Sequence, residues 1–182
     1  MAASSLPTQA IEQRLAAEHA AAYGWALHCC DGDPDDAADV LQATYMKVLS
    51  GQAVFGARAQ FRTWLFGVVR FTALEMQRRR RREIAFAAPG VPEDVARVPD
   101  ATATDGALLA AERTARIAEA IAQLPTRQRE VLHLVFYQEC TVAEAAVAMG
   151  VSVGAARVHY DRAKQRLRTL LGDGPDAREQ LA

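Results

Sequence analysis

Arginine is the residue that recurs where this sequence could do chemistry, and it is concentrated in two stretches. The first is an uninterrupted run made of Arg78, Arg79, Arg80, Arg81 and Arg82. The second is the stretch 157–168, which holds five basic residues and one acid. Guanidinium groups pair with phosphates and with the edge of guanine. Both stretches therefore predict contact with nucleic acid.

The charged residues of the chain are grouped into basic and acidic blocks, which the small net charge conceals. The 182 residues carry 21 Lys and Arg against 22 Asp and Glu, so the formal net charge is only −1. A separate cluster of acids, Asp31, Asp33, Asp35, Asp36 and Asp39, offsets the basic stretches. Because salt screens exposed charges beyond about 10 Å, the local blocks indicate function better than the average does.

Several function classes are excluded at this stage. The sequence has no CxxC, HExxH, P-loop or GxSxG motif, so an enzyme, a metal centre or a cofactor site is not expected. The three cysteines, Cys29, Cys30 and Cys140, form no disulfide framework and favour a reducing, cytoplasmic setting. No apolar run is long enough to cross a membrane, and residues 1–14 do not look like a secretory signal.

A helix-turn-helix is the most specific local pattern, over residues 141–168. Thr141 and Glu144 form a capping box, and Ser152 can cap the second helix. Ala146 permits close helix contact, and Gly150 suits a left-handed turn. Val153 and Ala156 are expected to face back onto the first helix. The second helix of such a motif enters the major groove of DNA with its N-terminal half.

Basic side chains lie on the faces of the second helix opposite Tyr160. Arg157 is early enough to reach a base edge, and the later bases suit phosphates. The candidate DNA contacts here are Ser152, Arg157, His159, Arg162, Lys164 and Arg166. A plain solvated helix face is the alternative interpretation, which the combination of caps, turn and bases makes less favourable.

Aromatic residues accompany the arginine run on a helix expected over about 61–83. Phe61, Trp64, Phe66 and Phe71 cannot all point into one apolar stripe, so some must be exposed. The expected core stripe is Phe61, Leu65, Val68 and Thr72. Exposed aromatics beside arginines form a stacking and phosphate-binding surface for single-stranded nucleic acid. The alternatives are ordinary core packing for the aromatics and a solvated helix end for the arginines.

The chain is predicted to be all-α, with two small helical domains joined by a flexible linker. The expected helices cover about 8–30, 35–49, 61–83, 107–124, a segment that Thr126 caps, 142–149 and 153–171. Leu49 and Phe136 are expected to face inward. The acidic, Pro- and Gly-containing stretch 86–106 separates domain 1–85 from domain 107–174, and 175–182 forms a tail.

The two parts together resemble the extracytoplasmic-function (ECF) branch of bacterial RNA polymerase sigma factors. Asp39-Val40-Leu41-Gln42, Phe61-Arg62-Thr63-Trp64-Leu65, Arg70 and the arginine run look like sigma region 2. Leu124-Pro125, residues 127–132 and the helix-turn-helix look like sigma region 4. The resemblance covers about 35–85 and 107–171, in the order of the family.

The resemblance implies a division of labour among the candidate residues. Docking on the β′ clamp of core RNA polymerase is implied for Asp36, Asp39, Val40, Gln42 and Tyr45. Opening and holding the minus-10 element is implied for Phe55, Arg58, Phe61, Arg62, Trp64, Arg70, Phe71 and the five arginines of the run. The second helix of the helix-turn-helix is implied to read the minus-35 element in promoter DNA. A cognate anti-sigma factor is also implied, and membrane insertion is not.

Some positions depart from the family pattern. Phe71 stands where an Asn associated with minus-10 base capture is common, and Ala43 replaces an acid. Val158 and His159 replace a small polar and basic pair. Two other functions stay open. One is a helix-turn-helix regulator that acts without polymerase, and the other is a sigma mimic that occupies an anti-sigma factor.

Overall fold

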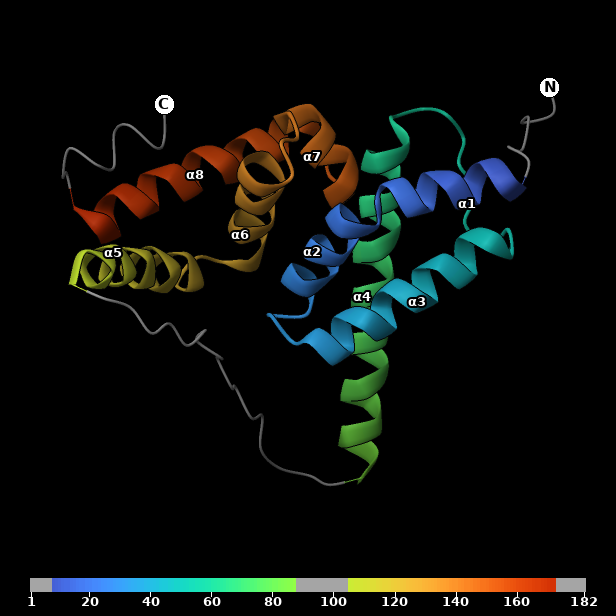
Figure 1. Cartoon of the computed structure of the whole chain (residues 1–182), viewed down its shortest axis with the longest axis horizontal. Helices are drawn as coiled ribbons and strands as arrows, with labels where there is room; N and C mark the ends of the chain where they lie inside the picture. The colour runs from blue at the N-terminus through green and yellow to red at the C-terminus, as the bar shows by residue number, and fades with distance from the viewer. Residues whose placement is uncertain (1–7, 88–104, 173–182) are drawn as a thin grey trace.

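Helices make up the computed structural model, which describes residues 8–87 and 105–172 (Figure 1). The elements are α1 (Thr8–Ala17), α2 (His19–Cys29), α3 (Pro34–Leu49), α4 (Phe61–Ala87), α5 (Asp105–Ala122), α6 (Thr126–Leu132), the π-helix η1 (His133–Tyr137), α7 (Val142–Met149) and α8 (Val153–Leu171). No strand occurs in these two ranges. The all-α prediction is confirmed.

In the N-terminal domain, α1–α4, the start of α3 is set by local capping residues. The Asp33 carboxylate accepts hydrogen bonds from the backbone N–H groups of Asp35 and Asp36, each at 3.0 Å, and Pro34 occupies the first turn of α3. The helix expected over 8–30 is divided at Glu18 into α1 and α2. Its backbone hydrogen bonds nevertheless continue through that turn, from Glu18 N to Arg14 O at 3.1 Å.

Trp25 anchors α2 to α4. It is fully buried, and its indole Nε1 donates a 2.9 Å hydrogen bond to the Phe66 carbonyl. This bond satisfies the polar end of a large apolar side chain, as burial of Trp requires. Leu65 and Val40 complete the centre of this core. Leu49, which was expected to face inward, is instead 44% exposed near the C-terminal end of α3.

The C-terminal domain, α5–α8, departs from the prediction where α6 continues as a π-helix. A π turn holds an extra residue and rotates the side chains that follow it. Phe136 is therefore 44% exposed instead of inward. Pro125, not Thr126, precedes the first residue of α6, so the expected Thr126 cap is wrong. A small core of this domain holds Leu124, Leu132, Ala163 and Leu167 with Ala120.

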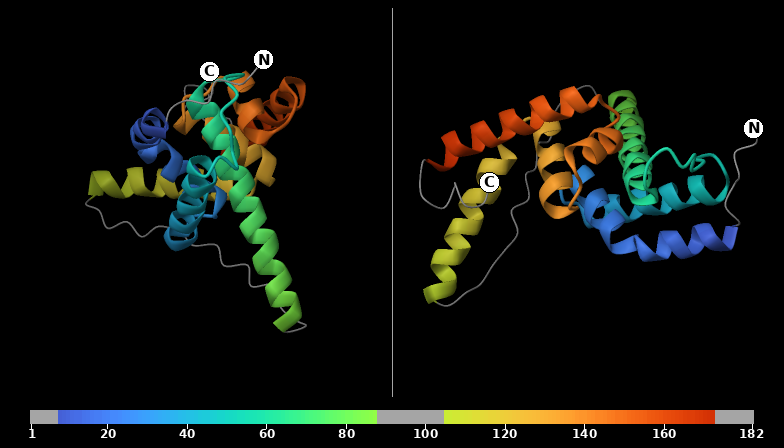
Figure 2. Two further views of the ribbon diagram at one scale, coloured as in Figure 1. Left: turned by 90° about the vertical axis from the view of Figure 1, so that its right-hand side faces the viewer. Right: turned by 90° about the horizontal axis from the view of Figure 1, so that it is seen from above.

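A larger core runs through both domains. Val131, Leu134, Ala145, Ala148 and Met149 of the C-terminal domain join the cluster that contains Trp25, Leu65 and Phe66. Helix α7 packs against α4, as the views in Figures 1 and 2 agree. At Gly67 an added Cβ would lie 3.7 Å from the Ala148 carbonyl oxygen, so the two helices are close there. We call this contact of α2 and α4 with α6, η1 and α7 the junction.

The C-terminal turns of α4 project beyond the other helices (Figures 1 and 2). The arginine run lies in the second half of this helix. Helix α4 extends to Ala87, beyond the expected end at about 83. The predicted linker 86–106 overlaps α4 and α5 at its ends, and its residues 88–104 lie outside the described residues, as does the predicted tail 175–182.

Candidate nucleic-acid interface

The helix-turn-helix has the local geometry that its sequence predicts. Glu144 N donates to Thr141 Oγ1 at 3.2 Å, and Thr141 N donates to Glu144 Oε2 at 2.9 Å, which completes the capping box. The hydrogen bonds that Thr141 N and Thr141 Oγ1 donate to the Glu144 carboxylate lower the pKa of Glu144. Gly150 adopts φ = 65°, and Ser152 Oγ accepts from Ala155 N at 3.2 Å. The caps and the turn are confirmed.

Helix α8 presents a basic face. Ser152, Arg157, Arg162 and Arg166 are exposed, whereas His159 and Lys164 are half-buried. The Lys164 ammonium lies 4.5 Å from the centre of the Tyr160 ring and 3.9 Å from Asp161. The structure thus brings all six predicted residues of this helix onto one element, with four of them open to a ligand.

Two apolar side chains on α8 were not anticipated at the surface. Val153, expected to pack against α7, is 44% exposed, and Val158 is 46% exposed beside Arg157. Ala156 faces α7 as predicted and is fully buried. Periodicity places Ala156 correctly because it lies on the buried stripe, but Val153 falls just outside the region that α7 covers.

The aromatic residues near the start of α4 form one cluster with the preceding loop. The rings of Phe55, Phe61 and Trp64 lie 5.3–5.4 Å apart, centre to centre. The Arg14 guanidinium lies 5.6 Å from the Phe61 ring. Phe61 is only 8% exposed, so its ring belongs to the core, whereas Phe55 and Trp64 are half-buried and Arg58 is exposed.

Farther along α4, the surface is open and cationic. All five arginines of the run are exposed. Arg80 pairs with Asp36 at 2.7 Å and Arg79 pairs with Glu83 at 2.8 Å. Phe71 is 63% exposed. This arrangement confirms that the aromatic residues of α4 do not all point inward.

A groove of about 470 Å³ lies beside Phe71, between α3, α4 and α7. Trp64, Gln52 and Val147 contribute to its lining, and Lys47 stands at its edge, with its ammonium 5.6 Å from the centre of the Phe71 ring. Lys47 also pairs with Glu75. The groove is thus walled by an exposed aromatic ring, apolar side chains and one paired cation.

Helix α3 carries the predicted polymerase-docking residues. Asp39 and Gln42 are exposed, and Asp36 is half-buried with its carboxylate on Arg80. The hydroxyl of half-buried Tyr45 lies 3.1 Å from His19 Nδ1. Val40 is 2% exposed and packs in the core, so its side chain does not belong to the docking surface.

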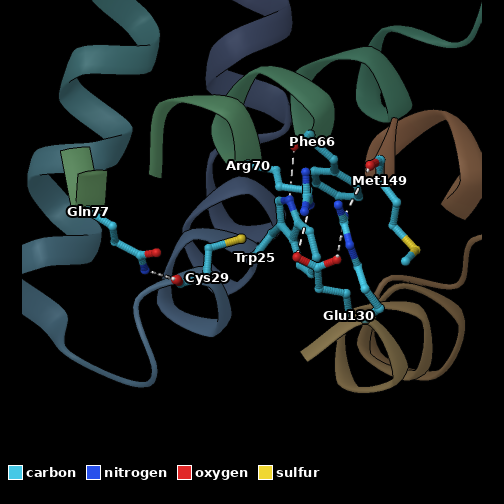
Figure 3. Close-up of polar contacts among 8 residues, drawn as sticks. Trp25, Cys29, Phe66, Arg70, Gln77, Glu130 and Met149 are labelled. Carbon is cyan, nitrogen blue, oxygen red and sulfur yellow. Dashed lines mark hydrogen bonds and ion pairs between the residues drawn. The ribbon is translucent and has the colours of Figure 1, made fainter. Parts of the chain in front are cut away.

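Two arginines predicted for the minus-10 surface, Arg70 and Arg62, are engaged at the junction instead, and Figure 3 shows the contact of Arg70 with Glu130. The side chain of Arg70 is 11% exposed, and its Nε lies 2.9 Å from Glu130 Oε1. Glu130 Oε2 also accepts from Arg127 Nη1 at 3.1 Å. Arg62 Nη2 donates to Gln138 Oε1 at 3.3 Å. Sequence reasoning missed this junction, although a Glu beside Val131 and Leu132 was a signal that α6 buries a charge.

No group of three or more potential metal ligands occurs among the described residues. Within the same ranges, none of the helices is both long and apolar enough to cross a membrane.

Both halves of the chain match known sequence families. Residues 15–83 match Sigma-70 region 2, and residues 114–167 match Sigma-70, region 4. The fold and the two matches therefore define the class of the protein: it contains regions 2 and 4 of the sigma-70 type.

Relatives narrow the class to a family. ECF RNA polymerase sigma factor SigL of Mycobacterium tuberculosis is 31% identical over 155 residues, which cover 83% of this chain and 84% of SigL. SigM of the same organism is 33% identical over 139 residues, covering 76% of this chain but only 65% of SigM. The chain belongs to the ECF RNA polymerase sigma factors.

A solved structure shares the arrangement of both domains. The sigma factor RpoE, crystallised with the anti-sigma factor NepR from Bartonella quintana, superposes with a TM-score of 0.69 at 25% identity. The match covers 90% of this chain and 97% of RpoE. The likeness therefore extends over both domains of this chain.

Proposed function

We propose that the chain binds core RNA polymerase and directs promoter-specific initiation of transcription in the cytoplasm. The observation that carries this proposal is the exposed basic face of α8 in a capped helix-turn-helix, in a member of the ECF family. The chain itself makes and breaks no covalent bond in this role, because the polymerase supplies the chemistry. Residues 107–174 would read the minus-35 element, and residues 1–85 the minus-10 element.

Recognition of the minus-35 element follows from the order of residues along α8. Arg157 lies in the second turn, where a recognition helix reaches base edges, and its guanidinium can pair with guanine. Exposed Val158 offers an apolar contact to a thymine methyl group. Arg162 and Arg166 lie farther along and suit phosphates, which fix the register.

The minus-10 element would be held along α4. Exposed Phe71 can stack on an unpaired base, and the arginine run can follow the strand's phosphates. Stacking on an aromatic side chain contributes about 1–3 kcal/mol per base, which is comparable with the few kcal/mol that unstacking a base costs. Exposed aromatic surface beside cations therefore favours the opened strand over the duplex.

Docking on the polymerase clamp would use the exposed acids and amide of α3. Asp39 and Gln42 are accessible for this contact. Asp36 is shared with Arg80, so the docking surface and the arginine run lie next to each other. One helix can then place the cationic end of α4 relative to the polymerase.

Full engagement with a promoter requires the junction to separate. Arg70 is held by Glu130 of the other domain, and Arg62 is engaged by Gln138 of the other domain and by Glu18 of its own. Because RpoE is in complex with the anti-sigma factor NepR in a similar arrangement, we also propose an anti-sigma protein as a partner of this chain's packed form.

The direct test is transcription by bacterial core polymerase with and without the purified full chain, on a library of promoter sequences. We expect transcripts from a restricted set of start sites only when the chain is present. Absence of any such transcript, with the chain bound to a symmetric duplex as a dimer, would refute the proposal.

Two variants separate the roles. Changing Arg157 and Arg162 to Ala should weaken minus-35 binding and leave the affinity for core polymerase unchanged. Changing Asp39 and Gln42 to Ala should do the reverse. The matched control is Arg116→Ala, which removes an exposed arginine from α5, outside both surfaces. Equal loss of both affinities in either variant would contradict the division.

A further inference from the structure

Aromatic rings from both domains meet at the junction. His28 of α2 and His133 of η1 stack with their ring centres 4.2 Å apart and their planes 27° from parallel. Trp25 lies against both imidazoles, at 5.3 Å from His28 and 5.4 Å from His133. Tyr137 stacks on His133 at 5.2 Å. Two titratable rings therefore lie face to face across the domain contact.

A chain of hydrogen bonds from Arg62 through Gln138 requires the imidazole of His133 to be neutral. Arg62 can only donate, so it engages the carbonyl oxygen of Gln138 and turns the amide nitrogen of Gln138 toward His133. Gln138 Nε2 lies 3.2 Å from His133 Nε2, which must accept and therefore carries no proton. A protonated His133 would oppose two donors across this contact, and turning the amide around would break its bond to Arg62.

The charged groups around the stack do not favour an imidazolium. Asp31, after α2, is paired with Arg129 of α6 at 3.4 Å. Glu130 of α6 is engaged by Arg70 of α4 and by Arg127. These carboxylates are thus already matched by guanidinium groups.

Other nearby groups do not change this balance. The side chains of Cys29 and Arg81 line the same cavity of about 130 Å³ as His28. Burial raises the pKa of the Cys29 thiol well above its ordinary value, so it brings no negative charge. Arg81 adds a positive one. No unmatched anion among these neighbours would stabilise a protonated His28.

We propose that the junction is an acid-sensitive closure, in which protonation of His28 and His133 releases α6, η1 and α7 from α2 and α4. In the closed form the two rings are neutral and stacked between the domains. In the open form each ring is solvated and takes up a proton at mildly acidic pH. Acid thereby separates the domains without unfolding either one.

The direction and size of the pH effect on the closure equilibrium follow from the linkage between protonation and closure. Burial, with the His133 ring and the Arg129 charge as lesser causes, lowers the pKa of His28 from 6.5 to about 3. Burial lowers the pKa of His133 from 6.5 to about 4. Closure is therefore fully favourable above pH 6.5 and weakens as pH falls below it. At about pH 5.5 each ring reduces the closure equilibrium constant about 10-fold, and the two together about 100-fold.

This inference goes beyond the proposed function, since it concerns only the equilibrium between two forms of the free chain. Its consequence for DNA, that acid uncovers Arg70 and Arg62, does rest on that function. The experiment below contains neither polymerase nor DNA, so it can fail while the transcription test succeeds, and the reverse.

Native thiols report on closure. Cys140 is 8% exposed within the core that the two domains share, so separation of the domains would expose its thiol. Cys30 is 9% exposed inside the N-terminal domain, beside Asp31, Asp33 and Asp36. The full chain would be labelled with a pyridyl disulfide between about pH 8 and pH 5.5. Mass spectrometry would then give each rate, divided by the rate of the same thiol in urea-unfolded chain.

We expect the corrected Cys140 rate to rise about 100-fold on acidification while Cys30 changes little. His28→Phe, which keeps the stacked ring without its proton, should reduce the rise to about 10-fold. His28→Phe with His133→Gln should abolish it. His19→Phe, an exposed position on the same helix as His28, is the matched control and should retain the full rise.

Three outcomes would overturn the inference. A Cys140 rate independent of pH would show that the junction does not respond to acid. A parallel rise at Cys30 would show general unfolding. An undiminished rise in His28→Phe would assign the response to other groups. Should the double variant fail to retain its helical circular dichroism at about pH 8, the single His28→Phe variant decides the matter.

Discussion

Removing the carboxylate of Glu130 should open the molecule. Glu130 is 5% exposed and is held between Arg70 and Arg127 at the centre of the junction. Glu130→Ala leaves the Arg70 side chain, which is only 11% exposed, in the junction without its anion. Since Arg70 regains water when the domains part, the closed form bears this penalty and the open form does not.

The free-energy cost of Glu130→Ala follows from the burial of both Glu130 and Arg70. Deleting one member of a buried ion pair costs about 3–5 kcal/mol. At about 1.4 kcal/mol per factor of ten, this change shifts the closure equilibrium by about 100- to 4,000-fold toward the open form. The apparent loss of stability stops at the free energy of closure itself, because opening relieves the rest.

Small-angle X-ray scattering at neutral pH measures the outcome as a larger radius of gyration, and circular dichroism verifies that the helices remain. The matched control is Glu119→Ala, the same deletion at an exposed position on α5. Binding of single-stranded DNA by the free chain should increase in Glu130→Ala, since Arg70 is released. A radius of gyration and urea midpoint equal to those of Glu119→Ala would refute the reasoning.

Substitutions at three further positions test other parts of the structure. Gly67→Ala should be tolerated and favour α4 by up to about 1 kcal/mol, whereas Gly67→Phe should separate α4 from α7, which scattering detects. Thr141→Ala removes the cap of α7 and should lower stability by about 1 kcal/mol in urea unfolding. Arg80→Ala breaks an exposed pair and should change stability by under about 1 kcal/mol. It should also reduce the salt slope of DNA binding by about 1 if Arg80 contacts a phosphate.

Features encoded in a few adjacent residues were predictable. The capping box of Thr141 and Glu144, the left-handed Gly150 and the Ser152 cap each need only residues within one turn. Their hydrogen bonds form in the helix itself and do not depend on distant packing. The all-α class and the helix-turn-helix could be predicted for the same reason.

Features that depend on a second element were not predictable. Phe66 is fully buried although it lies outside the expected stripe of α4, because Trp25 of α2 and the shared core cover that side of the helix. The exposure of Phe136 was not predictable, because the π-helix that rotates this side chain outward leaves no trace in a 3.6-residue period. Arg70 looked like a DNA contact, and nothing near it in sequence indicates that Glu130 lies against it.

The long helix α4 fixes the spacing of the basic side chains along it. Its 27 residues run without interruption from the shared core to the exposed arginine run. At about 1.5 Å per residue, Arg70 and Arg78 are separated by about 12 Å along the axis. When α6 leaves α4, Glu130 leaves with it and Arg70 joins the exposed cations of α4. Their spacing is already fixed by the α-helix, and no new surface has to fold.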